Sequence, residues 1–213
     1  SMIELFFVCL SILSLIVIAE FLWRRKLVQV ELSRKLIHMG TGIIVAFSPF
    51  FLSWTYIQLL SVAFLVVIIA SYKLHIFSSI HDVKRITRGE ILYPVGIGIC
   101  ALLEPAPWIF TAAILHLAIA DGLAAIVGLK WGKRTRYMIL SHGKSLLGSM
   151  TFFYTSMAIF AGALYFVAPE NRPNLLTLLV LFPLILTLLE NISWFGSDNI
   201  TVPVSVIVLL SIV

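Results

Sequence analysis

The chain has 213 residues, of which 61% are hydrophobic and only 12% are charged, and its mean hydropathy is +1.07. Water-soluble domains are roughly 45–50% apolar and about 25% charged, and a soluble fold of this size has too little interior to hide so much apolar surface. The composition therefore excludes a soluble globular protein. It predicts an all-α integral membrane protein with a single transmembrane helical domain over residues 1–213.

Continuous apolar stretches, rather than alternating ones, favour a helical bundle over a membrane barrel. In chain order, the predicted membrane helices cover residues 3–22, 36–52, 54–72, 91–104, 107–129, 146–168, 174–190 and 200–213. Two of them are short for a span, so we expect about seven or eight transmembrane helices. Cys9 and Cys100 lie inside these stretches, which predicts buried thiols with no disulfide or metal-binding role.

Basic residues indicate how the chain is oriented. They gather in three loops, at 23–35, 73–90 and 130–145, whereas the turns on the opposite side contain one basic residue, Arg172. Because cytoplasmic loops attract Lys and Arg, we expect these loops and the turn at 190–199 to face the cytoplasm. The N-terminus and the C-terminus would then both lie on the non-cytoplasmic side.

Acidic residues gather near the same side of the membrane. Ionisable side chains at the middle of a membrane helix cost about 2.5–3.5 kcal/mol each, yet Glu90, Asp121, Glu190 and Asp198 all occur at or within the predicted helix ends. Asp121 is the deepest, and its helical face has small residues that let another helix approach. These small residues are Ala124, Ala125, Gly128 and Gly132. A carboxylate in a packed seam needs a cation or a hydrogen-bond donor, so Asp121 indicates a site.

Glycines, a lysine and two serines surround the predicted start of the sixth helix. They are Gly143, Lys144, Ser145, Gly148 and Ser149. A helix N-terminus offers free N–H groups and a positive dipole to an anion, and the lysine adds a charge. The full Walker spacing is absent because Met138 stands where a glycine is required. The segment therefore predicts a phosphate-binding site of another kind.

Charged residues also precede the second predicted helix. Glu31, Arg34, Lys35 and His38 fall on one helical face. A histidine one turn inside the apolar boundary could bind phosphate or exchange protons. The other histidines are scattered and show no zinc-ligand spacing, and His116 stands alone within a predicted span.

These groups fit phosphoryl transfer from a nucleotide, which needs Mg²⁺ held by carboxylates and basic residues on the phosphate oxygens. Asp121, Glu190 and Asp198 can supply the carboxylates. The positive charge can come from Lys144, Arg136, Lys133, Arg34 and Lys35. A site embedded in a membrane implies a lipid acceptor whose tail stays among the helices.

Several of these segments resemble the polyprenol kinases, the family that includes phytol, farnesol and dolichol kinases and the CTP-dependent diacylglycerol kinase. In the order of that family, the matching segments are Glu31 with 34–38, 88–94, 120–124 with Gly128 and Gly132, 143–149, and Glu190 with 198–203. Leu147 departs from the family pattern, which often has an acidic residue at that position. The family looks like a distant relative of the phosphatidate cytidylyltransferases.

The resemblance implies Mg²⁺ as cofactor, CTP as phosphoryl donor and a membrane isoprenoid alcohol as acceptor, of the phytol, farnesol or geranylgeraniol type. It implies a catalytic and metal-binding centre of Asp121, Glu190 and Asp198. Together with the residue patterns, it places at the nucleotide Lys144, Ser145, Gly143, Gly148, Ser149, Arg136, Lys133 and Asn199. Contacts to substrate or phosphate are expected from Arg34, Lys35, His38 and Glu90.

Two alternatives stay open. The first is another lipid enzyme, either a CTP-dependent diacylglycerol kinase or an enzyme like phosphatidate cytidylyltransferase that releases pyrophosphate. The second is a small transporter in which Asp121 and His116 carry protons or cations, although no internal repeat of the kind found in many transporters is evident. Membrane lipids are expected partners and nucleic acid is not.

Overall fold

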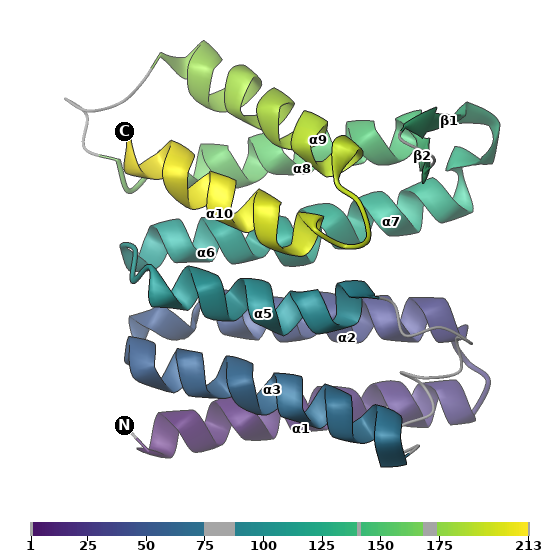
Figure 1. The fold of residues 1–213 in the computed structure, drawn as a ribbon, viewed down its shortest axis with the longest axis vertical. Helices are drawn as coiled ribbons and strands as arrows, with labels where there is room; N and C mark the ends of the chain where they lie inside the picture. Colours follow the sequence, from purple (N-terminus) through teal and green to yellow (C-terminus); the bar gives the residue numbers. More distant parts are fainter. Residues whose placement is uncertain (1, 75–87, 140–141, 168–173, 213) are drawn as a thin grey trace.

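A computed structural model describes residues 2–74, 88–139, 142–167 and 174–212 (Figure 1). Among the described residues the regular elements are helices apart from one short hairpin, which confirms the predicted all-α membrane bundle. The α-helices are α1 (Met2–Arg24), α2 (Val30–Ala46), α3 (Trp54–Leu74), α5 (Arg88–Leu102), α6 (Pro107–Leu115), α7 (Asp121–Lys130), α8 (Leu146–Ala163), α9 (Phe182–Ile192) and α10 (Asp198–Ser211). Short 3₁₀ turns are η1 (Ser48–Phe50) and η3 (Gly132–Thr135), and π-helical turns are η2 (His116–Ala120) and η5 (Thr177–Leu181).

Length and apolar composition make four of the described helical segments able to cross a membrane. These segments are Met2–Arg24, Trp54–Ser71, Pro107–Lys130 and Leu146–Ala163. Shorter apolar helices cover Gly89–Leu102, Thr177–Ile192 and Asp198–Ser211. The helices lie side by side and alternate in direction, so that the two chain ends lie at one end of the bundle (Figure 1).

The opposite end of the bundle gathers the connections that matter for the site. The α1–α2 connection, the segment between α7 and α8, and the turn between α9 and α10 all lie there (Figure 1). The first two of these connections fall within basic loops, so the described basic loops share one end of the molecule. Which end faces the cytoplasm stays a prediction from the charge pattern.

The interior is filled by aromatic and aliphatic side chains, of which Phe110, Phe152 and Phe160 are fully buried. The outer helix α1 packs mainly against α2, and only 17% of its apolar span is buried within the protein. Cys100 is buried as expected, but Cys9 on α1 is exposed. The prediction for Cys9 was wrong because an apolar stretch in a membrane protein contacts lipid as readily as protein.

One element was absent from the sequence prediction. The strands β1 (Arg136–Ile139) and β2 (His142–Ser145) form an antiparallel hairpin between α7 and α8. The helix boundaries also differ, since α2 already begins at Val30 and α8 ends at Ala163. Hydropathy marks where a helix contacts lipid, whereas the helical backbone continues into or stops short of the polar boundary.

Candidate active site

A pocket of about 840 Å³ opens at the end of the bundle that carries the hairpin. Its volume falls within the roughly 300–1,000 Å³ typical of small-molecule sites. Its walls come from α2, α5, α7, the hairpin, α8, α9 and the start of α10. Every residue that the sequence assigned to the site lines this pocket except Lys133, which is exposed in η3.

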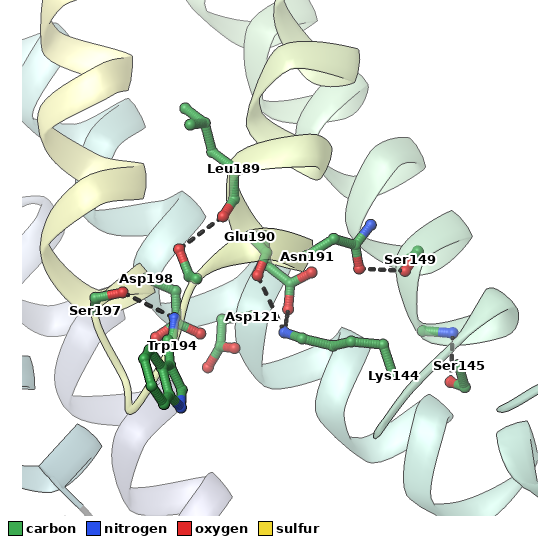
Figure 2. A network of polar contacts seen from close by, with 12 residues as sticks. Asp121, Lys144, Ser145, Ser149, Leu189, Glu190, Asn191, Trp194, Ser197 and Asp198 are labelled. Atoms are coloured by element: carbon green, nitrogen blue, oxygen red, sulfur yellow. Dashed lines mark hydrogen bonds and ion pairs between the residues drawn. The ribbon is translucent and has the colours of Figure 1, made fainter. Parts of the chain in front are cut away.

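Three carboxylates meet in the pocket from separate helices. Asp121 begins α7 directly after the π turn η2, Glu190 lies near the end of α9, and Asp198 begins α10. One oxygen from each lies within 4.8 Å of the others, and Figure 2 shows the three side chains converging. At that distance each like-charge pair repels by roughly 3 kcal/mol at an effective dielectric constant of about 20. An all-oxygen set of this kind fits Mg²⁺, which prefers carboxylate ligands.

A short turn returns the chain from Glu190 to Asp198. Phe195 and Gly196 both adopt positive φ angles, 53° and 83°, a conformation that glycine tolerates and that a bulky residue rarely adopts. The hydroxyl of Ser197 accepts a hydrogen bond from the backbone N–H of Trp194 at 3.0 Å. The turn thereby places the first residue of α10 beside the last turn of α9.

Two lysines approach the carboxylates from different elements. Lys35 on α2 lies 3.2 Å from Asp121 (Nζ to Oδ2). Lys144 on β2 forms an ion pair with the carboxylate of Glu190 and donates to the Glu190 carbonyl at 3.1 Å (Figure 2). Three carboxylates and two lysines leave one negative charge uncompensated among these five groups. The remaining negative charge favours the binding of a cation.

Lys144 lies in the hairpin, outside the apolar helices, and is part-buried. Burial lowers the pKa of an ammonium, but the carboxylates of Glu190, Asp198 and Asp121 together raise the pKa of Lys144 above its usual value. The side chain therefore stays positively charged throughout the physiological range. It can neutralise an acidic group or a phosphate equally well.

An arginine of the pocket joins α2 to α5. Arg34 on α2 lies 2.7 Å from Glu90 on α5 (Nη1 to Oε1), and both side chains are largely shielded from solvent. Arg136 begins β1 and lines the pocket with an exposed side chain. Of these two arginines, Arg34 is therefore paired with Glu90, whereas Arg136 is accessible to a ligand in the pocket.

His38 is held between a backbone carbonyl and Asp121. Its Nε2 lies 3.1 Å from the Leu117 carbonyl and 3.6 Å from Asp121 Oδ2. A carbonyl can only accept, so the hydrogen bond to Leu117 requires the proton on Nε2. Tyr93 donates its hydroxyl to the His38 carbonyl at 2.8 Å, and its ring lies 4.0 Å from the imidazole. These contacts fix the orientation of His38 at the inner wall.

Glycines of the predicted small-residue face and of α8 surround Ser145. Ser145 is the N-cap of α8, and its hydroxyl accepts a hydrogen bond from the N–H of Gly148 at 3.1 Å. A Cβ atom on Gly128, Gly132 or Gly148 would come within 3 Å of that hydroxyl. Glycine at these positions lets α7 and α8 approach and leaves room for the cap. The close approach was expected, whereas the capping role of Ser145 was not.

Similarity to a known protein accompanies this geometry. The chain is 30% identical over 196 residues to the phytol kinase of Synechocystis sp. (strain ATCC 27184 / PCC 6803 / Kazusa), and the match covers 89% of this chain and 82% of that protein. The chain belongs to the phytol kinase-like family of polyprenol kinases. No protein-family model matches the chain, and no solved structure matches it.

Two polar residues that contact the wall of the pocket escaped the sequence analysis. Tyr137 on β1 donates its hydroxyl to Asn191 Oδ1 at 2.9 Å, and Ser149 donates to the same oxygen at 2.9 Å. Asn191 directly follows Glu190, which was the available signal for it. Tyr137 had no such signal, because its position depends on a hairpin that the sequence did not predict.

His116, which the transporter alternative paired with Asp121, lies in the helical core outside the main pocket. Its ring is fully buried, with Nδ1 2.7 Å from the Ala112 carbonyl and Nε2 2.8 Å from the Ser156 hydroxyl. Both ring nitrogens therefore have partners, as is usual for a histidine with a structural role.

Proposed function

We propose that this protein is a kinase that transfers the γ-phosphoryl group of CTP to a membrane isoprenoid alcohol of the phytol, farnesol or geranylgeraniol type. One observation carries the proposal: three carboxylates and two lysines, far apart in the sequence, meet in one pocket at the end of a membrane bundle. Homology to a phytol kinase supports the same reaction class.

The carboxylates would hold the metal. Asp121, Glu190 and Asp198 offer converging oxygens, and bound Mg²⁺ would neutralise phosphate charge and orient the phosphoryl group. In the reaction, the alcohol oxygen forms the new bond to phosphorus, the bond from phosphorus to the bridging oxygen breaks, and CDP leaves. One of the three carboxylates would accept the proton of the alcohol.

The cations would bind the phosphate groups. Lys144 contacts Glu190 and carries a charge that a phosphate oxygen can take over, and Arg136 lies on the rim of the same pocket. Lys35 compensates the charge of Asp121. Charge-assisted contacts of this kind are stronger than neutral hydrogen bonds.

The acceptor would reach the pocket from the bilayer. The polar cluster lies at the end of apolar helices, and the same pocket is also lined by Ala124, Ala125 and Leu129. A lipid alcohol can place its hydroxyl at the carboxylates while its tail remains in an apolar environment. A site at the end of a membrane bundle therefore favours an acceptor that resides in the bilayer.

A transfer assay on the purified protein tests the proposal. Four γ-labelled nucleotides (CTP, ATP, GTP and UTP) are each offered with Mg²⁺ to phytol, farnesol, geranylgeraniol, diacylglycerol and phosphatidate. We expect label from CTP to appear on an isoprenoid alcohol, with CDP as the second product. In Asp121→Asn we expect neither labelled lipid nor CDP. Label on diacylglycerol alone would show a diacylglycerol kinase. Pyrophosphate release would show a cytidylyltransferase, and no transfer to any acceptor would contradict the proposal.

A further inference from the structure

A tyrosine of the β1–β2 hairpin is hydrogen-bonded to two helices of the bundle. The Tyr137 hydroxyl lies 2.6 Å from the hydroxyl of Ser149 on α8 and 2.9 Å from Oδ1 of Asn191 on α9. Ser149 and Asn191 are also hydrogen-bonded to each other at 2.9 Å (Figure 2). Asn191 is buried, so the tyrosine reaches into the protein rather than along its surface.

The hairpin register links this contact to the candidate active site. Tyr137 is paired directly with Lys144 across the two strands, and residues directly opposite in an antiparallel pair project from the same face. Tyr137 contacts Asn191 while Lys144 contacts the adjacent Glu190. A cross-strand pair of the hairpin therefore contacts two consecutive residues of α9.

This arrangement matters because neither partner would be well placed alone. An isolated two-stranded hairpin is marginally stable at best in water. A lysine side chain has four rotatable bonds and loses substantial conformational entropy when it is fixed. Holding Lys144 at Glu190 thus requires the backbone of β2 to be held. Ser145, the N-cap of α8, holds the C-terminal end of β2, and Tyr137 holds the facing strand directly opposite Lys144.

We propose that Tyr137, together with Ser149 and Asn191, is a positioning residue that holds Lys144 in place for the phosphate of the nucleotide. The catalytic part of this inference rests on the proposed kinase function. The structural part, that the Tyr137 hydroxyl keeps Lys144 against Glu190, does not.

Zero-length crosslinking tests the structural part without nucleotide or activity. A carbodiimide joins a lysine and a carboxylate in contact into an amide, which mass spectrometry locates between residues 144 and 190. We expect Tyr137→Phe, which keeps the ring and removes the hydroxyl, to lower the yield of this crosslink several-fold. Tyr154→Phe on the exposed side of α8 is the matched control and should leave it unchanged. An undiminished yield in Tyr137→Phe would overturn the inference.

Kinetics test the catalytic part. Loss of one hydrogen-bonded anchor corresponds to about a tenfold effect, so Tyr137→Phe should raise KM for CTP about tenfold and leave KM for the alcohol unchanged. In a Lys144→Met background the same substitution should change kcat/KM less than about twofold, because residues that act through one another are not additive. If the effects of Tyr137→Phe and Lys144→Met on kcat/KM were fully additive, Tyr137 would have a general structural role instead. Absence of transfer in the unmodified protein would refute the kinase proposal, and the crosslink would still decide the anchoring.

Discussion

Two groups of polar side chains lie inside this bundle, and their partners are of different kinds. In the helical core, His116 is bonded to a backbone carbonyl and to the hydroxyl of Ser156, and Thr111 donates to the Ala46 carbonyl at 2.8 Å. In the pocket, Lys35 and Lys144 face carboxylates from other elements. The core groups are neutral and matched donor to acceptor, whereas the pocket groups are charged.

This difference distinguishes polar side chains that stabilise the fold from polar side chains that can bind a ligand. A neutral hydrogen bond in the core contributes only to stability, and breaking it leaves a buried polar atom without a partner. An ion pair in an open pocket can exchange one partner for a metal ion or a phosphate at little net cost. Substitutions in the core should therefore lower stability and spare activity, and substitutions in the pocket should do the opposite.

The largest effect is expected from Asp121→Asn. It keeps the size of the side chain and removes a carboxylate from the cluster, so turnover should fall by about 10³-fold or more while the thermal midpoint changes little. Activity assays and thermal unfolding measure the two quantities. Glu104→Gln, in the turn at the opposite end of the bundle, is the control. Near-normal turnover in Asp121→Asn would remove that residue from the catalytic set.

Metal dependence should separate the carboxylates from the lysines. In Glu190→Gln or Asp198→Asn the Mg²⁺ concentration for half-maximal activity should rise by at least about tenfold, because each removes one oxygen ligand of a hard cation. Chelation should abolish activity in the unmodified protein, and added Mg²⁺ should restore it. An unchanged Mg²⁺ requirement in both variants would place the metal elsewhere.

Ser156→Ala tests the expectation that polar side chains of the helical core affect stability rather than activity. It leaves Nε2 of the fully buried His116 without its partner, so the free energy of unfolding should fall by about 1–3 kcal/mol. Activity per folded molecule should stay within about twofold. Denaturation combined with transfer assays gives both values, with Ser11→Ala on the outer helix α1 as a matched control. A specific loss of turnover at full stability would mean that the core network takes part in the reaction.

Two basic residues only three positions apart offer a finer test. Arg136 lines the pocket and Lys133 does not, although both looked like phosphate-binding candidates in the sequence. Arg136→Ala should raise KM for CTP by about fivefold, the effect of one partly exposed ionic contact. Lys133→Ala should leave it unchanged. Equal effects would indicate a diffuse attraction to basic charge rather than a defined contact.

The smallest effect concerns pH. Because the pKa of Lys144 is raised in the folded protein, its ion pair contributes stability that is fully present below the ordinary lysine value of about 10.4 and is lost as pH rises through the higher folded value. Carbon NMR of reductively methylated lysines, with Lys144→Arg to assign the signal, measures this titration. A midpoint below the ordinary value would mean that burial outweighs the carboxylates.

The sequence alone determined the class of the protein and the identity of most pocket residues. Apolar stretches are local and continuous, so they predicted the helices correctly apart from their ends. Charged residues in or beside such stretches are costly in a bilayer, so Asp121, Glu190 and Asp198 could be singled out as candidates without any structure. Basic loops likewise predicted an orientation that remains a prediction.

Only the tertiary structure decided which of these residues contact each other and which additional ones join them. Four-residue strands carry too little local signal to predict, so the hairpin, Tyr137 and its contact with Asn191 emerged only with the fold. The same holds for the pairing of Lys144 with Glu190 and for the capping role of Ser145. Such contacts join residues that are distant in the chain or depend on the exact approach of two helices, and hydropathy and spacing contain no information on either.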